Sequence, residues 1–201
     1  RENFPIPLEA VWEIFSDYLF LINSEFNIKI ISFVLMSNHF HMICRDPDMK
    51  LPIAMQWLMR ETSKEIGRRS GRINRLWGAP YFSTVLGSSN YFLYAYKYNY
   101  RNPVAAGACL KVQDYPWSTL HTLLGRRTGV IPMELDETLF DNLPRALEWL
   151  NTAYSKEEAA ALKKAFQKKV AKLVKDEKTN YLNPLLAKDV EQEITRWVPE
   201  S

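Results

Sequence analysis

The sequence predicts an α+β protein with an antiparallel sheet and helices packed on one face of it. Two stretches with apolar residues at helical spacing flank a pair of apolar stretches of strand length. Two polar residues separate the members of this pair, which is typical of an antiparallel hairpin. The chain has 201 residues, of which 47% are apolar, so it is long enough for one packed domain and an appendage.

The first helix is expected at about residues 7–24. Prolines at positions 5 and 7 suit a helix start, and the apolar residues that follow are spaced to share one face: Leu8, Val11, Trp12, Phe15, Leu19 and Ile22. A strand at about 27–36 follows. A tight turn at Ser37 and Asn38 then leads to a short strand that carries His39 and His41.

Two further helices are expected in the next part of the chain. One begins at Pro52 and places four residues on a common face, namely Ala54, Leu58, Thr62 and Ile66. Residues 82–86 are expected to form a short strand. The next helix covers residues 90–102, because Ser89 offers a cap at its start and Pro103 disfavours helical geometry at Asn102.

The composition changes after Gly125, which predicts a boundary between a domain at 1–125 and a helical extension at 126–201. From about residue 132 onward we expect helices only. Ser155 and Glu158 form a capping-box pattern. An apolar stripe follows, formed by Leu162, Phe166, Val170 and Leu173. The lysines opposite this stripe are expected to face water, and the alternative is that they lie on nucleic acid.

Composition also excludes several classes of protein. No apolar run approaches the ~20 residues that cross a bilayer, so we expect no membrane partner and a cytoplasmic location. Cys44 and Cys109 have neither the number nor the spacing of a disulfide framework or a zinc site. The net charge of +3 permits nucleic acid binding without requiring it.

The histidine pair is the first candidate for chemistry. His39 and His41 are two of only three histidines. Side chains at positions i and i+2 of a strand point to the same face, about 6.6 Å apart along the strand, so the two imidazoles can share a divalent cation. The alternative is a pair of half-buried imidazoles that bond to backbone carbonyls.

A second candidate lies on the helix at 90–102, which is rich in tyrosine. Tyr98 and Asn102 are four residues apart and therefore share a helix face. A phenol and an amide oxygen on one face can meet the histidine pair. Considered alone, the two residues also fit a core tyrosine and a helix-capping asparagine.

Basic residues suggest a nucleic acid surface at the end of the second helix. They are Lys64, Arg68, Arg69, Arg72 and Arg75, with Trp77 and Tyr81 close behind. Arginine presents planar donors to phosphate, and aromatic rings can stack on unpaired bases. The alternative is a solvated helix end.

Four motifs in this order resemble a known family. They are MSNHFHMI at 36–43, LWG at 76–78 before YFST at 81–84, YNYRNPVAAG at 98–107 and DYPWS at 114–118. The combination resembles the single-tyrosine HUH transposases, and within them the REP-associated tyrosine transposases (IS200-like). The resemblance covers about residues 1–125.

The resemblance implies a ferredoxin-like antiparallel sheet and a role for each matched residue. The metal pair of the family falls on His39 and His41, its nucleophile on Tyr98 and its third metal ligand on Asn102. Such enzymes cut single-stranded DNA beside a hairpin with Mg²⁺ or Mn²⁺, forming a 5′-phosphotyrosine. We expect DNA contacts from the basic residues named above and from Arg101, and a monomer or homodimer.

Two departures from the family pattern are visible. The opening strand of the family is not seen before Arg1, and Ala105 stands where arginine is common. Three other functions remain open: a metal-dependent phosphoesterase that does not use Tyr98, a domesticated DNA-hairpin binder without catalysis, and a helical scaffold.

Overall fold

The computed structural model describes residues 3–72, 76–87, 89–126, 131–134 and 142–171. The chain forms two compact units, and neither is a continuous stretch of sequence. Unit 1 combines Arg1–Tyr81 with Asn99–Leu135, and unit 2 combines Phe82–Tyr98 with Asp136–Ser201. The C-terminal part of the chain therefore contributes to both units, whereas the sequence predicted one boundary after residue 125.

Unit 1 begins with the expected helix. Helix α1 spans Leu8–Phe26 and follows Pro7, and it buries seven residues along one side: Val11, Trp12, Ile14, Phe15, Ser16, Leu19 and Ile22. Asn27 adopts a left-handed conformation with φ 57°, and its N–H bonds to the carbonyl of Ile22. Asparagine tolerates this conformation better than most residues, so it ends the helix and directs the chain into the sheet.

The next two elements form the predicted hairpin. Strand β1 (Lys29–Leu35) pairs antiparallel with strand β2 (Phe40–Arg45), and a bulge lies between Ile30 and Ser32. The turn is closed by the N–H of Met36, which donates to the carbonyl of His39 at 2.8 Å. His41 lies in β2 as expected. His39 lies in the turn, one residue before β2 begins, because the regular pairing of the two strands ends at Leu35 and Phe40.

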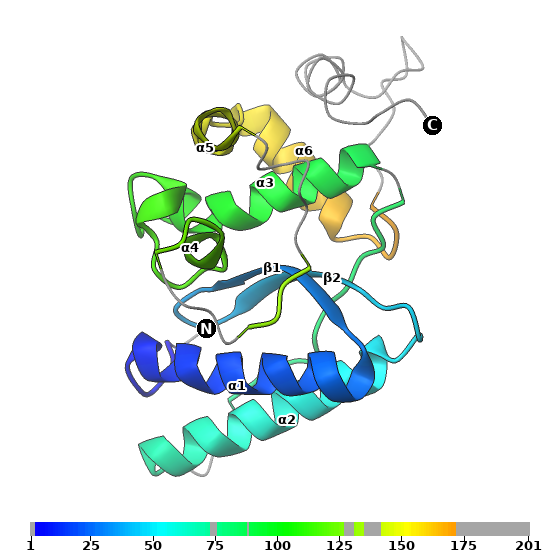
Figure 1. Cartoon of the computed structure of the whole chain (residues 1–201), viewed down its shortest axis with the longest axis vertical. Coiled ribbons are helices and arrows are strands. Elements are labelled where there is room, and N and C mark those ends of the chain that lie inside the picture. Colours follow the sequence, from blue (N-terminus) through cyan, green and yellow to red (C-terminus); the bar gives the residue numbers. More distant parts are fainter. Residues whose placement is uncertain (1–2, 73–75, 88, 127–130, 135–141, 172–201) are drawn as a thin grey trace. The chain divides into compact units, whose positions relative to one another are not determined.

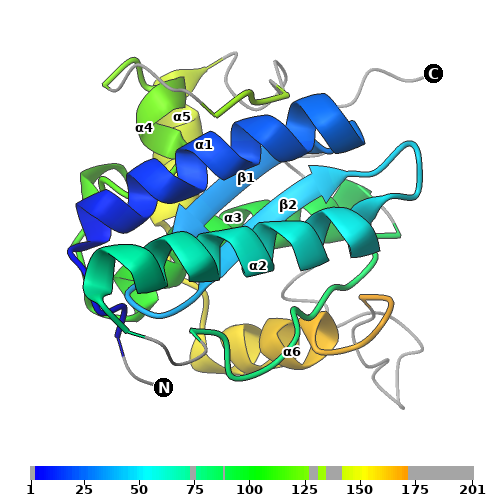
Figure 2. The ribbon, with the colours of Figure 1, turned by 90° about the horizontal axis from the view of Figure 1, so that it is seen from below.

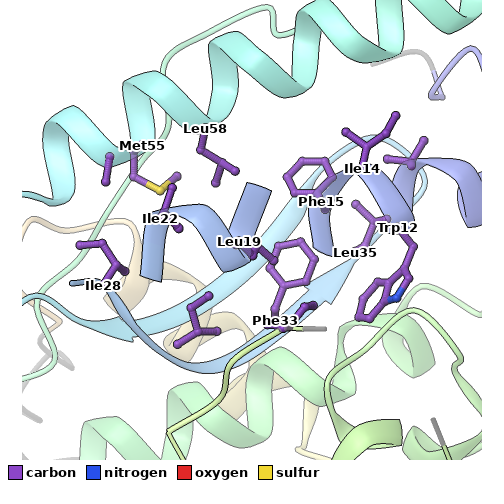
Figure 3. Packing of buried hydrophobic residues seen from close by; sticks show 14 of the residues in the cluster. Trp12, Ile14, Phe15, Leu19, Ile22, Ile28, Phe33, Leu35, Met55 and Leu58 are labelled. Carbon is purple, nitrogen blue, oxygen red and sulfur yellow. The ribbon is translucent and has the colours of Figure 1, made fainter. Parts of the chain in front are cut away.

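Helix α2 (Leu51–Ser70) has Pro52 in its first turn and buries the predicted face together with Met55. Figure 2 shows α1 and α2 side by side across one face of the hairpin. Between these helices and the hairpin lies the main core, in which the ring of Phe15 packs against that of Phe33 with the centroids 5.4 Å apart (Figure 3). The ring of Phe40 also contacts that of Phe15, with the centroids 5.2 Å apart. Alternation along the strands explains why Phe33, Leu35 and Phe40 all reach this core.

The second edge of β1 is also occupied, by segments that are distant in sequence. The N–H of Thr119 donates to the carbonyl of Phe33, and the N–H of Leu35 donates to the carbonyl of Trp117, both at 2.9 Å. The N–H of Glu134 donates to the carbonyl of Ile30 at 2.7 Å. The prediction of helices only from residue 132 is therefore wrong at its start, because residues 131–134 extend along β1.

Between these segments lie a 3-10 turn, η1 (Val112–Asp114), and the short helix α4 (Leu120–Leu123). Thr119 connects them to the sheet, because its hydroxyl accepts a hydrogen bond from the N–H of Phe33 at 2.9 Å and lies 3.0 Å from the hydroxyl of Tyr100. The hydroxyl of Tyr115 donates to the carbonyl of Leu35 at 2.6 Å. These buried bonds fix residues 112–124 against β1.

Helix α3 spans Ser89–Ala105 and so continues three residues past the predicted end at Asn102. Pro103 lies inside it. The N–H of Gly107 bonds to the carbonyl of Val104, and the N–H of Ala108 bonds to the carbonyl of Pro103. This pair of bonds is a Schellman motif. Gly107, with φ 72°, supplies the left-handed residue that the motif requires, so Gly107 rather than Pro103 ends the helix.

Unit 2 packs the first part of α3 against two later helices, α5 (Leu143–Asn151) and α6 (Lys156–Phe166), which are labelled in Figure 1. The capping box of Ser155 and Glu158 is present as predicted. Leu162 and Ala165 are buried with Tyr94, and α6 ends before Val170, which is 54% exposed. The predicted stripe thus stops at Phe166, and Leu173 lies outside the described residues.

Residues 82–86 do not form the predicted strand. They carry one isolated bridge, in which Val85 pairs in parallel with Val170. The N–H of Val85 donates to the carbonyl of Lys169, and the N–H of Ala171 donates to the carbonyl of Val85, both at 2.9 Å. Both hydrogen bonds involve a single residue of this segment, Val85, so the segment forms an isolated bridge and not a strand.

The α+β class is confirmed, with a two-stranded sheet in the described residues and helices α1 and α2 over one of its faces. The ferredoxin-like arrangement stays a prediction. In the described part of the chain, no helix has the length and apolarity needed to cross a membrane.

Candidate metal and nucleophile site

The two predicted metal ligands lie together at the start of β2. The Nε2 atoms of His39 and His41 are 3.1 Å apart, and the rings are nearly perpendicular at 80° with their centroids 4.9 Å apart. The turn places His39, and strand β2 places His41, so both imidazoles project from the same end of the hairpin.

The spacing of the two nitrogens suits a shared octahedral ion. Two nitrogens on adjacent octahedral positions, each about 2.1 Å from the ion, lie about 3.0 Å apart. The described residues contain no group of three His, Cys, Asp or Glu side chains that could hold a metal. A divalent ion at this pair would therefore need amide, water or phosphate oxygens as its other ligands, and such oxygens suit Mg²⁺ or Mn²⁺.

Asn38 orients the first histidine. The Nδ1–H of His39 donates to the Oδ1 atom of Asn38 at 2.7 Å. With its proton on Nδ1, this imidazole carries a lone pair on Nε2, the atom that faces His41. A hydrogen bond to the distal ring nitrogen is the usual way in which proteins orient a metal-binding histidine. Asn38 was predicted only as a turn residue, and its place directly before His39 is the sequence signal for this second role.

His41 is held neutral by its surroundings. Burial, with a smaller effect from neighbouring His39, lowers the pKa of His41 from 6.5 to about 4. A metal binds the neutral imidazole, so protons do not compete for this ligand at neutral pH. Without a metal, the Nε2–H of His41 can donate to the lone pair of His39, which accounts for their short separation.

The last turns of α3 lie on the sheet face that carries His41. Cross-strand partners share a face, and Val34 is the partner of His41. Ser32 lies on the same face as Val34, and its hydroxyl accepts a hydrogen bond from the side-chain amide of Asn99 at 3.2 Å. Asn102 is half-buried and follows Asn99 by three residues on this helix. Its role as third ligand stays a prediction.

Tyr98 belongs to unit 2 and lies on α3, four residues before Asn102. Its ring meets that of Phe166 from α6 edge to face, with the centroids 5.4 Å apart. Burial raises the pKa of its hydroxyl above 10. The phenol is therefore protonated at neutral pH and would lose its proton during an attack. Its role as nucleophile stays a prediction.

The buried neighbour of Tyr98 is a feature that sequence analysis missed. Lys97 is only 6% exposed, and its Nζ lies 4.8 Å from the ring centroid of Tyr154 and 5.4 Å from that of Trp149. Rings on two sides stabilise a desolvated ammonium group. These contacts join the middle of α3 to α5 and to the loop that follows α5.

Three of the predicted DNA-binding residues are already paired with carboxylates. Arg68 and Arg69 bond to Glu65 at 2.7 and 2.8 Å, and Lys64 bonds to Glu61 at 3.1 Å. The two arginines hold the pKa of Glu65 at about 2. All three basic residues are exposed, as is Arg72, while Arg101 is half-buried on α3. Arg75 lies outside the described residues, and contacts of this set with DNA stay a prediction.

Residues 8–98 match the family described as "Transposase IS200 like". The matched segment includes the histidine pair and ends at Tyr98. Through this segment, which is 91 of the 201 residues, the chain is similar to the IS200-like transposase family. An IS200-like transposase is an enzyme of DNA transposition that cleaves DNA. No curated protein and no solved structure shows significant similarity to the chain.

Proposed function

We propose that this protein is an IS200-like transposase that cuts single-stranded DNA next to a hairpin and rejoins it through a covalent tyrosine intermediate. The observation that carries the proposal is the 3.1 Å separation of the Nε2 atoms of His39 and His41 inside a transposase-family segment. Two imidazoles at this spacing match the needs of a divalent ion that acts on phosphate.

In the proposed reaction, the Tyr98 hydroxyl oxygen attacks the scissile phosphorus in line. The Tyr98 O–P bond forms and the P–O3′ bond breaks. The phenol proton passes to water, and the departing 3′-oxygen takes a proton from water to become a 3′-hydroxyl. The product is a 5′-phosphotyrosine, which preserves a phosphodiester for rejoining. A bound Mg²⁺ or Mn²⁺ would neutralise charge on the scissile phosphate.

The protein's own residues would divide the remaining tasks. His39 and His41 would hold the ion, Asn38 would keep the ligand nitrogen of His39 unprotonated, and Asn102 would add an amide oxygen. A single-stranded segment is flexible enough to bring its phosphate to a helix-borne tyrosine. The basic residues of α2 would contact the adjacent duplex stem, and Arg101 would contact the strand near the site.

Membership of the REP-associated branch, which would make a REP-like hairpin the substrate, is part of this proposal. The protein is proposed to act as a monomer or a homodimer in the cytoplasm. Two alternatives give different products: a phosphoesterase would cut DNA without an adduct, and a domesticated hairpin binder would bind without cutting.

Incubation with single-stranded oligonucleotides that carry a hairpin, in the presence of Mn²⁺, tests the proposal. We expect a covalent protein–DNA adduct on a denaturing gel, absent with a chelator and in Tyr98→Phe. Tyr91→Phe, on the same helix, is the matched control and should retain the adduct. Cleavage that survives in Tyr98→Phe would favour the phosphoesterase, and binding without cleavage would favour the hairpin binder.

A further inference from the structure

Exposed lysines lie at and just beyond the end of α6, close in sequence to Phe166, whose ring touches that of Tyr98. We call Lys163, Lys164 and Lys169 the α6 lysine surface. The first two share the last helical turn with Phe166, whose ring contacts the Tyr98 ring at 5.4 Å. All of these residues belong to unit 2.

The position of Lys169 is fixed by the backbone. Its carbonyl accepts a hydrogen bond from the N–H of Val85 at 2.9 Å, and the next bond of the same ladder joins Ala171 to Val85. The segment after α6 therefore stays close to the segment that leads into α3. Tyr94, Leu162 and Ala165 form the buried cluster that joins the two helices beneath these lysines.

The α6 lysine surface has no acidic neighbours in sequence, unlike the basic part of α2. No Asp or Glu occurs between Glu158 and Asp176. Among the described residues, no carboxylate lies within ion-pair distance of these three lysines. On α2, by contrast, a phosphate would have to replace Glu61 or Glu65, which reduces the electrostatic gain from binding DNA.

We propose that the α6 lysine surface binds backbone phosphates of the single strand that Tyr98 attacks. The inference rests on the proposed function, because that function brings a scissile phosphate to Tyr98. The phosphates next to it on the same strand then lie near the helical turn that holds Phe166. Lysine binds phosphate as a point charge and follows a flexible strand without requiring one base sequence.

The test compares the affinities of two oligonucleotides, a hairpin with a single-stranded flank and the same hairpin with a blunt end. The flank advantage is the Kd for the blunt hairpin divided by the Kd for the flanked one. Binding is measured in Tyr98→Phe with a chelator, so that no chemistry contributes. The salt slope is the slope of the logarithm of the binding constant plotted against the logarithm of the salt concentration. Each phosphate contact on a single strand adds about −0.7 to it.

We expect Lys163→Gln, Lys164→Gln and Lys169→Gln, combined, to reduce the flank advantage at least tenfold at 100 mM salt. The salt slope should become less negative by about 2. Glutamine has nearly the helix propensity of lysine, so α6 should remain folded, which circular dichroism checks. The matched control combines Lys64→Gln, Arg68→Gln and Arg69→Gln, which changes net charge equally. It should leave the flank advantage within about twofold.

A flank advantage that survives in the α6 variant, or one that the α2 variant removes equally, would overturn the inference. So would a wild-type chain without any flank advantage. These outcomes are separate from the adduct test. A chain that forms the adduct but binds the flank elsewhere retains the proposed function, whereas a chain that forms no adduct loses that function even if the flank binds to α6.

Discussion

Asn38 holds the ring proton of His39 on Nδ1, so replacing Asn38 should weaken metal binding without removing a metal ligand. In Asn38→Ala, His39 loses the acceptor 2.7 Å from Nδ1, and its proton can move to Nε2. Loss of such a partner typically lowers metal affinity about 10- to 100-fold. Calorimetric titration with Mn²⁺ measures this loss.

Ser37→Ala is the matched control, because Ser37 is the exposed neighbour in the same turn. The nitrogen NMR chemical shifts of the imidazole rings in the metal-free protein distinguish a change in the His39 tautomer from damage to the fold. They should report one tautomer of His39 in wild type and in Ser37→Ala, and a mixture in Asn38→Ala. A single Nδ1–H tautomer together with unchanged affinity in Asn38→Ala would contradict the assignment.

The lowered pKa of His41 predicts that acid destabilises the metal-free protein. The unfolded chain binds a proton on this ring below about pH 6.5, whereas the folded chain does so only near pH 4. The contribution of His41 to the free energy of unfolding is therefore fully present above pH 6.5. It falls by about 3 kcal/mol as the pH drops toward 4. Urea unfolding at several pH values measures this loss. His41→Asn should flatten the curve in this range, and an identical curve in the variant would disprove the prediction.

At the scale of elements, the end of α3 depends on one glycine. Gly107 adopts φ 72° in the Schellman motif, and a Cβ there would meet no atom within 4 Å, so the effect of a side chain is purely conformational. Gly107→Ala should lower the free energy of unfolding by about 1 kcal/mol. Gly78→Ala, an exposed position that is equally open, is the control. Equal stability of the two variants in urea would show that Gly107 does not set the helix end.

Elements that depend on local spacing were predictable from the sequence. Helices α1 and α2 and the β1–β2 hairpin follow from apolar spacing, α3 from the cap residue before it and the proline near its end, and the capping box from two residues three positions apart. Pairings between distant segments were not predictable. Val85 pairs with Val170, and Ile30 with Met133, and nothing in the local pattern of either segment identifies its partner.

The candidate site shows the same division. The proximity of His39 and His41 follows from their spacing by two, and it is found in the structure. The pairing of Arg68 and Arg69 with Glu65 also has helical spacing and was predictable, although only the basic residues entered the predicted DNA surface. The contact between Tyr98 and Phe166 joins positions 68 residues apart, so only the fold shows it.

For the molecule as a whole, residues beyond Gly125 contribute to the packing of both units. Ile131 is 5% exposed within the main core of unit 1, and Glu134 bonds to β1. In unit 2, Leu162 and Ala165 bury Tyr94, and Trp149 and Tyr154 cover Lys97. Each unit thus takes part of its packing from residues after 125.

A chain that ends at Gly125 should therefore be unstable, even though it retains His39, His41, Tyr98 and Asn102. It loses the burial of Ile131, worth about 2 kcal/mol. It also loses the hydrogen bond from Glu134 to β1, and it exposes the apolar face that α3 buries in unit 2. We expect broad thermal unfolding and binding of a hydrophobic dye. A chain that ends at Ala171 keeps every contact named above and is the matched control, for which we expect a sharp transition. If the shorter chain also unfolded sharply at the same temperature, residues 131–171 would be dispensable for folding, and the predicted boundary after residue 125 would describe the protein better than the two units do.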